Sequence, residues 1–125
     1  MKKQEELIKT YVDGYNTFNM KKMLLPLHSK IVFENYSKDE LTMRLEGIKA
    51  FKKQAKKGFE MFSKRRREIL SLEHQEDRVV ALTSYTATLK VDLGDQMKKG
   101  QVMSISGKSI FYFQEDRMSK IEDYS

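Results

Sequence analysis

Two tyrosines whose hydroxyl groups could take part in binding or catalysis, Tyr11 and Tyr15, stand four residues apart in the first predicted helix. Residues three and four apart share one face of an α-helix, so both hydroxyl groups lie along an apolar stripe that also carries Leu7, Ile8 and Val12. A phenol in apolar surroundings can donate a hydrogen bond to a ligand oxygen, or it can bond a backbone carbonyl as part of the core. The spacing therefore predicts either pocket-lining or core tyrosines.

Three further polar or aromatic candidates follow from strand alternation. Asn35 is the last inward-facing residue of a short predicted strand, where its amide can orient a ligand or satisfy the strand end. Tyr85 lies on the inward face of a longer strand, where we expect its ring to form an aromatic wall of the pocket. Ser109 shares a face with Phe111 and Phe113. We expect these three residues, with Tyr11 and Tyr15, to line a ligand-binding pocket.

The acid–base candidates are the neighbours Glu122 and Asp123 in the last predicted strand. Successive residues of a strand point to opposite faces, so one of the two faces inward, and the sequence does not decide which. A carboxylate in a dry pocket has a raised pKa and can act as a base. Neither His28 nor His74 has a carboxylate or second histidine at ligand spacing. With no phosphate-binding glycine loop and no zinc motif, the sequence predicts no metal and no cofactor.

Three helices and five strands position these residues. Apolar periodicity predicts helices over residues 5–18, from the capping residue Asn19 onward, and from Gly47 to about residue 62. Period-two patterns predict strands over residues 31–36, 68–74 and 79–91 and a closing hairpin over 100–125, while 37–46 read as a polar connection and 63–67 as a break. The order predicts one domain, residues 1–125, of the α+β class: helices packed on the concave face of a curved, mostly antiparallel sheet.

Charge and composition limit the classes of partner that the protein can be expected to bind. The chain has 125 residues, a net charge of +6 and no cysteine, which fits a cytoplasmic protein. The excess of basic residues lies mainly between Lys49 and Arg67, and we expect it to form a solvated face. The alternative is that these residues bind nucleic acid phosphates. Because no nucleic-acid-binding motif accompanies them, no nucleic acid partner is predicted. No run approaches the roughly 20 apolar residues of a membrane span, and no membrane partner is predicted.

The outer face of the sheet also carries apolar residues. If Val79 and Ala81 face inward, Val80 and Leu82 face outward. A second subunit is a natural cover for such a face, and the sequence predicts a homodimer.

Four stretches together resemble the SnoaL-like family of the nuclear transport factor 2-like superfamily. They are LIKTYVDGYNTFNMKKMLLPL, KIVFENY, EGIKAFKKQAKKGF and GKSIFYFQEDRMSKIEDYS, and they span nearly the whole chain. The resemblance implies a cone, in which helices and a curved sheet surround an apolar pocket, and a dimer formed through the sheet. The superfamily includes isomerases, cyclases, dehydratases, epoxide hydrolases and non-catalytic binders, so the fold does not fix the function.

The isomerase-like pattern of that superfamily is only partly present. The resemblance places Tyr11 at the position of the tyrosine that donates to an oxyanion. Asn35 stands where the pattern has a proton-transferring carboxylate, and Ser109 stands near the position of the donor acid. Glu34 is adjacent to Asn35, but alternation turns it to the opposite face. An amide cannot accept a proton at neutral pH, so this particular machinery is predicted to be absent.

Three functions are consistent with the sequence. The first is a small-molecule binder that takes an apolar ligand, with catalysis unproven. The second is an isomerase, cyclase or dehydratase acting on a small apolar carbonyl compound, in which Tyr11 polarises the carbonyl and Glu122 or Asp123 is the base. The third is a protein-interaction module that uses the outer sheet face or the basic helix.

Overall fold

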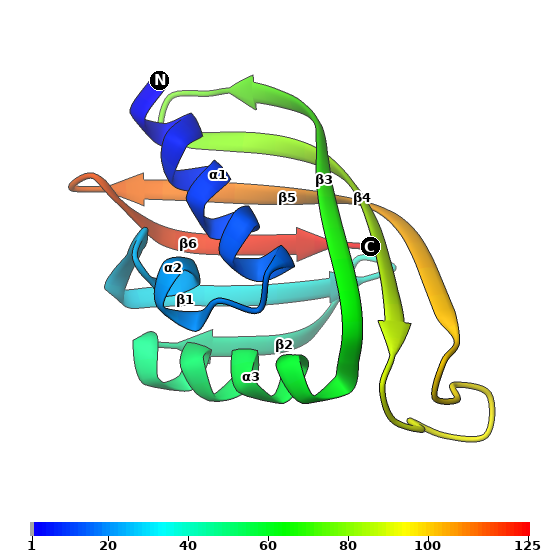
Figure 1. The fold of residues 1–125 in the computed structure, drawn as a ribbon. Coiled ribbons are helices and arrows are strands. Elements are labelled where there is room, and N and C mark those ends of the chain that lie inside the picture. Colours follow the sequence, from blue (N-terminus) through cyan, green and yellow to red (C-terminus); the bar gives the residue numbers. More distant parts are fainter. Residues whose placement is uncertain (1) are drawn as a thin grey trace.

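The computed structural model describes residues 2–125 as three helices and six strands (Figure 1). The helices are α1 (Lys2–Asn16), α2 (Met20–Leu24) and α3 (Ile48–Met61). The strands are β1 (Leu27–Ser37), β2 (Glu40–Glu46), β3 (Phe62–His74), β4 (Arg78–Leu89), β5 (Val102–Gln114) and β6 (Arg117–Tyr124).

The six strands form one mixed sheet in the order β2-β1-β6-β5-β4-β3. Strands β3 to β6 follow one another as an antiparallel meander, and β1 pairs with β2 in the same antiparallel manner. The pair β1 and β6 is parallel, and it brings the first and last strands together in the middle of the sheet. The predicted α+β class with a mostly antiparallel sheet is confirmed.

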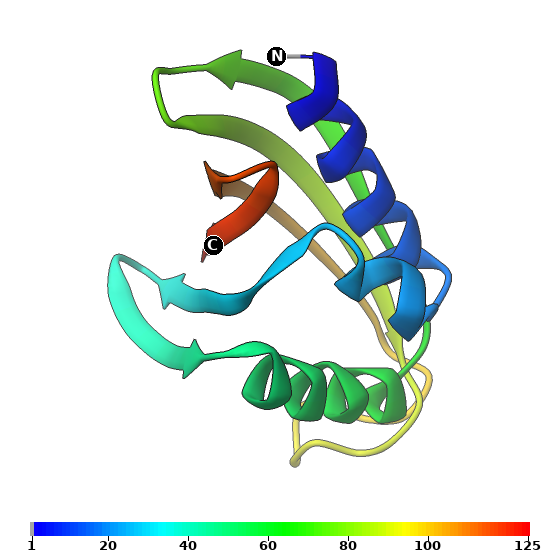
Figure 2. The same ribbon diagram turned by 90° about the vertical axis from the view of Figure 1, so that its left-hand side faces the viewer.

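The sheet curves around the helices, which lie on its concave side (Figure 2). Each helix contributes an apolar side to one shared core: Ile8, Tyr11 and Val12 from α1, Met23 from α2 and Phe51 from α3. The sheet supplies fully buried partners at the concave face, namely Ile31, Val79, Ala81, Phe111, Met118 and Ile121. Burial of these side chains is the main stabilising contribution to the fold.

The starts of α2 and α3 agree with the sequence, whereas α1 begins and ends two to three residues earlier than the predicted 5–18. Asn19 caps α2 as predicted, because its side-chain oxygen accepts a hydrogen bond from the Lys22 backbone N–H at 3.1 Å. Gly47 precedes α3 with φ of 89°, a conformation that favours glycine. Gly14 lies where α1 meets α2, and a Cβ atom there would be 2.5 Å from the Met23 backbone nitrogen.

The predicted polar connection over residues 37–46 is wrong, because most of it, Glu40–Glu46, is strand β2. Lys38 and Asp39 both have positive φ and close a tight hairpin between β1 and β2. Met43 and Leu45 then alternate with exposed neighbours and turn inward, a period-two pattern within a polar segment.

The predicted break at residues 63–67 is also wrong, because β3 begins at Phe62 and runs through the basic segment. Pairing with β4 places Arg65 opposite Ala87 and Arg67 opposite Tyr85. Both partners face the concave side, so Arg65 and Arg67 point into the protein while Lys64 and Arg66 point outward. The basic segment is therefore solvated on one face only.

No helix within residues 2–125 is long and apolar enough to cross a membrane.

Candidate functional site

A two-lobed cavity lies on the concave side of the sheet. The α3 lobe, of about 240 Å³, is lined by Tyr11, Tyr15, Met23, Phe33, Asn35, Met43, Leu45, Phe51, Gln54, Ala55, Gly58, Arg65, Arg67 and Asp123. The β5 lobe, of about 210 Å³, is lined by Tyr15, Asn35, Arg67, Thr83, Tyr85, Ile105, Gly107, Lys108, Ser109, Asp123, Tyr124 and Ser125. Tyr15, Asn35, Arg67 and Asp123 line both lobes and form the waist between them.

The five residues predicted to line a pocket all contact this cavity. Tyr11 lines the α3 lobe, Tyr85 and Ser109 line the β5 lobe, and Tyr15 and Asn35 belong to the waist. The rings of Tyr15 and Tyr85 are adjacent, with centroids 6.1 Å apart. Helix α1 and strands β1, β4 and β5 thus bring together residues that are up to 98 positions apart in the chain.

Tyr11 is both a core residue and a cavity residue. It is 2% exposed and packs edge-on against Phe111, with ring centroids 6.0 Å apart. Burial is the main cause of a raised pKa of the Tyr11 hydroxyl, and the nearby Asp123 carboxylate adds to it. Burial likewise raises the pKa of Tyr85, together with the neighbouring Tyr15. Both phenols therefore stay neutral at physiological pH and can donate a hydrogen bond.

The structure distinguishes the two acidic residues of the last strand. Asp123 faces the cavity, where its Oδ1 accepts a hydrogen bond from the Ser109 hydroxyl at 2.7 Å and its Oδ2 lies 3.4 Å from Arg67 Nη2. Glu122 faces the opposite side of the sheet. Among the described residues that line the two lobes, Asp123 carries the only acidic side chain.

Arg65 and Arg67 are two charged cavity residues that the sequence reasoning missed. Arg65 is 8% exposed, and its Nε donates a hydrogen bond to the Tyr15 carbonyl at 3.0 Å. The backbone of Arg67 exchanges two hydrogen bonds with the Asn16 side chain, at 2.7 and 3.0 Å. Both arginines are thereby fixed to the last turn of α1, where the orphan carbonyls and the helix dipole favour a positive charge.

A signal for these two arginines was present in the sequence. Ile69 packs against the core, and counting back from this apolar residue in steps of two gives Arg67 and Arg65. Four basic residues in a row hid that alternation. The sequence could not show that the concave face has room for two guanidinium groups.

The electrostatics of the waist depend on one ion pair. Burial alone would lower the pKa of Arg67, but the Asp123 carboxylate and the neighbouring tyrosines outweigh it and raise that pKa. Burial lowers the pKa of Arg65, which has no carboxylate at ion-pairing distance among the described residues. Because guanidinium groups titrate far above neutral pH, both arginines stay charged.

The histidines lie elsewhere. His28 Nδ1 accepts a hydrogen bond from the Lys30 backbone N–H at 3.0 Å, and His74 Nε2 lies 2.8 Å from Glu5 Oε2. Neither residue lines the two lobes.

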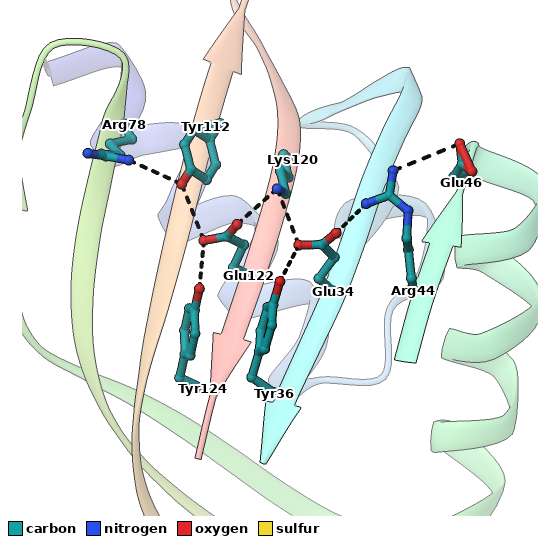
Figure 3. Close-up of polar contacts among 9 residues, drawn as sticks. All are labelled: Glu34, Tyr36, Arg44, Glu46, Arg78, Tyr112, Lys120, Glu122 and Tyr124. Atoms are coloured by element: carbon teal, nitrogen blue, oxygen red, sulfur yellow. Dashed lines mark hydrogen bonds and ion pairs between the residues drawn. The ribbon is translucent and has the colours of Figure 1, made fainter. Parts of the chain in front are cut away.

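A second polar cluster covers the outer face of the sheet (Figure 3). Lys120 bridges two buried carboxylates, with Nζ 3.2 Å from Glu34 Oε1 and 2.9 Å from Glu122 Oε2. Glu34 also accepts hydrogen bonds from Tyr36 and Arg44, and Glu122 accepts them from Tyr112 and Tyr124. Within residues 2–125, the polar contacts of Asp123 go to Ser109 and Arg67 and not to this outer-face cluster.

Comparison with known proteins identifies related folds. Residues 5–124 match the family model of the SnoaL-like polyketide cyclases. A comparison with curated proteins found no significant match.

Three solved structures illustrate the similarity of fold. A provisionally assigned polyketide cyclase from Xanthomonas campestris pv. campestris shares 16% identity with a TM-score of 0.80, over 99% of this chain and 90% of the other. AclR, a provisionally assigned hydroxylase from Streptomyces galilaeus, shares 21% identity with a TM-score of 0.77, over 98% and 88%. TerC, which was co-crystallised with polyporic acid, shares 16% identity with a TM-score of 0.79, over 97% and 89%.

Proposed function

The chain belongs to the SnoaL-like polyketide cyclase family, and from this premise we propose that its two-lobed cavity binds a small, mostly apolar molecule. The resemblance found in the sequence is thereby confirmed, whereas the ligand is the proposal. The observation that carries it is the waist, where Tyr15, Asn35, Arg67 and Asp123 converge between two hollow lobes. Concave sites with apolar walls and a few convergent polar groups are the usual form of small-molecule sites.

The walls of the α3 lobe support the apolar character of the ligand. Most of its non-polar lining comes from one rim of the sheet and from α3, namely Phe33, Met43, Leu45, Phe51 and Ala55. Methionine adapts its shape to irregular ligands, and Phe33 packs edge-on against Phe51 with centroids 5.7 Å apart. TerC, which has a similar fold, was co-crystallised with polyporic acid, and this supports an organic ligand in this fold.

Native mass spectrometry of the protein purified from its own host tests the binding proposal. The wild type is expected to carry a co-purified small molecule. Ala55→Phe, which adds a ring to the wall of the α3 lobe, is expected to lose it. The same adduct in both proteins would place the molecule outside the lobe and contradict the proposal.

A second candidate function is proton transfer on a bound carbonyl compound, and the position of Asp123 favours it. The Asp123 carboxylate can take a proton from the carbon next to a carbonyl, which leaves an enolate whose oxygen carries the negative charge. The neutral phenol of Tyr11 and the guanidinium of Arg67 line the same lobe and can stabilise that oxygen. The enolate then either takes back the proton from Asp123, or its carbon attacks a second carbonyl of the same molecule to close a ring, and the alkoxide formed at that carbonyl takes the proton from Asp123.

Deuterium exchange separates the binder from the enzyme. Once the ligand is identified, its carbon-bound hydrogen should exchange in D₂O with wild-type protein and exchange at least 100-fold more slowly with Asp123→Asn. Tyr11→Phe should slow the exchange as well. Equal exchange in wild type and Asp123→Asn would leave binding as the function.

We further propose a homodimer, formed through the outer face of the sheet by two chains that each form one domain. Leu82 and Val102 are 50% and 65% exposed there. The neighbouring outer-face cluster holds equal numbers of acidic and basic side chains, so two copies can meet without net repulsion (Figure 3). Light scattering at micromolar concentration is expected to give twice the chain mass, and the mass of one chain would contradict the dimer.

A cytoplasmic location is also proposed. The absence of cysteine supports it, because disulfides are common in proteins of oxidising compartments. Cell fractionation tests this location, and recovery of the protein outside the cytoplasm would contradict it.

A further inference from the structure

Two guanidinium groups approach one aromatic ring inside the cavity. The Arg65 Cζ atom lies 3.5 Å from the ring centroid of Tyr15, and the Arg67 Cζ atom lies 4.4 Å from the same centroid. Phe18 and Phe59 add two further rings around Arg65, at 4.9 and 5.1 Å. The rings compensate part of the cost of burying these charges, but they supply no hydrogen-bond acceptor in the plane of the guanidinium.

The charges of the α3 lobe do not balance. Arg65, Arg67 and Asp123 are its only charged side chains among the described residues, and they leave one net positive charge. Asp123 lies 3.4 Å from Arg67 and has a second partner in Ser109, so it does not neutralise Arg65. A buried charge without an opposite charge is costly, and the cost falls when an anion enters.

Both guanidinium groups also keep an unused donor. Arg65 Nη2 and Arg67 Nη1 are buried and have no hydrogen-bond partner among residues 2–125. Most buried polar groups in folded proteins are paired, so two unpaired donors in neighbouring arginines of one cavity call for a specific cause. A carboxylate bound against the two guanidinium groups would supply acceptors of the kind that these donors lack.

From this charge and donor imbalance we infer that the natural ligand carries a carboxylate, which is received by Arg65 and Arg67 in the α3 lobe. A planar carboxylate matches the fork of a guanidinium and can accept two parallel hydrogen bonds. The inference rests on the proposed binding function and specifies its substrate class: an apolar molecule with an acidic end.

Calorimetric titration with a matched pair of probes tests the inference. 2-Naphthoate and 2-naphthamide have the same ring system and nearly the same shape, and only the first is charged. Wild-type protein is expected to bind 2-naphthoate at least tenfold more tightly. Arg65→Gln should remove most of that preference, whereas Arg66→Gln, the same change at the adjacent outward-facing residue with a 71% exposed side chain, should retain it.

Asp123→Asn provides a variant that is expected to change the affinity for 2-naphthoate in the opposite direction. It removes the negative charge that competes for Arg67, so the affinity for 2-naphthoate should rise severalfold while that for 2-naphthamide changes little. Damage to the fold would lower both affinities. This variant therefore separates the charge effect from a loss of structure.

The outcomes that overturn the inference differ from those that overturn the binding function. Equal affinity for both probes contradicts the carboxylate and leaves small-molecule binding intact. A preference for 2-naphthoate that survives Arg65→Gln but falls in Arg66→Gln assigns the effect to surface charge and also contradicts it. Absence of binding by either probe contradicts the binding function, and the inference falls with it.

Discussion

Replacement of Glu34 by glutamine should destabilise the protein in a pH-dependent manner. The Glu34 side chain is 7% exposed, and it accepts hydrogen bonds from Tyr36 at 2.8 Å, from Lys120 at 3.2 Å and from Arg44. A neutral amide loses the two ionic bonds, and among these three partners only the Tyr36 hydroxyl can accept a hydrogen bond from its NH₂ group. Such bonds contribute roughly 1.5–3 kcal/mol each when buried, and solvent recovers part of this at the half-exposed Arg44 and Lys120. We expect Glu34→Gln to lower the free energy of unfolding by about 2 kcal/mol at pH 7.

The pH dependence follows from the direction of the Glu34 pKa shift. Burial raises the pKa of this carboxyl, but the hydrogen bonds from Tyr36, Lys120 and Arg44 outweigh burial and lower it below its ordinary value. A carboxyl with a lowered folded pKa stabilises the protein above its unfolded pKa of about 4.3, and this contribution is lost as the pH falls through the folded pKa. The difference between wild type and Glu34→Gln should therefore shrink below about pH 4.3.

Urea unfolding followed by circular dichroism, at pH 7 and at several values down to pH 3.5, measures this difference at fixed protein concentration. Glu46→Gln is the matched control, because Glu46 is 72% exposed and lies 4.0 Å from Arg44 in the same cluster. Glu46→Gln should lower the free energy of unfolding by less than about 0.5 kcal/mol. A loss in Glu34→Gln that stays constant over this pH range would refute the assignment of its stability to the ionised carboxylate.

Three further changes test other parts of the structure. Gly14→Ala should lower the thermal midpoint and reduce the free energy of unfolding by about 1–3 kcal/mol, because its methyl group would lie 2.5 Å from the Met23 backbone nitrogen. An unchanged midpoint would contradict the close contact between α1 and α2. Leu82→Lys should convert the proposed dimer to a monomer in light scattering, and a persistent dimer would place the interface elsewhere. Asn16→Ala should cost about 1–3 kcal/mol in urea unfolding, since it removes both hydrogen bonds to the Arg67 backbone, and a loss below about 0.5 kcal/mol would contradict that anchor.

Much of the fold is encoded in local periodicity and was predictable for that reason. The stripes of α1 and α3, the capping residue Asn19 and the alternation of β4 and β5 each have a strong local signal. Strand β2 has a weak one, since it is mostly polar and exposed, and it forms because the Lys38–Asp39 turn returns it to β1. The parallel pairing of β1 with β6 joins the first and last strands of the chain and has no local signature.

The site was predictable where a residue type agreed with its periodicity. Tyr11, Tyr15 and Tyr85 are aromatic residues at inward positions, and all three contact the cavity. Arg65 and Arg67 were missed because charge usually indicates solvent, and only the packing of β3 against the end of α1 explains how two buried guanidinium groups are held. The orientation of Asp123 rather than Glu122 depends on the register of β6 between β1 and β5, which the sequence does not specify.

The most direct test of the cavity as a binding site is a ¹H–¹⁵N NMR titration with a set of small aromatic carbonyl compounds. The proposed function predicts chemical shift changes that cluster at the backbone amides of Asn35, Gly58 and Gly107, which lie around the two lobes. Amides of the exposed lysine face of α3, such as Lys53, should stay unchanged. Shift changes confined to that helix face or to the outer face of the sheet, or the absence of any change, would contradict the assignment of the cavity as the site.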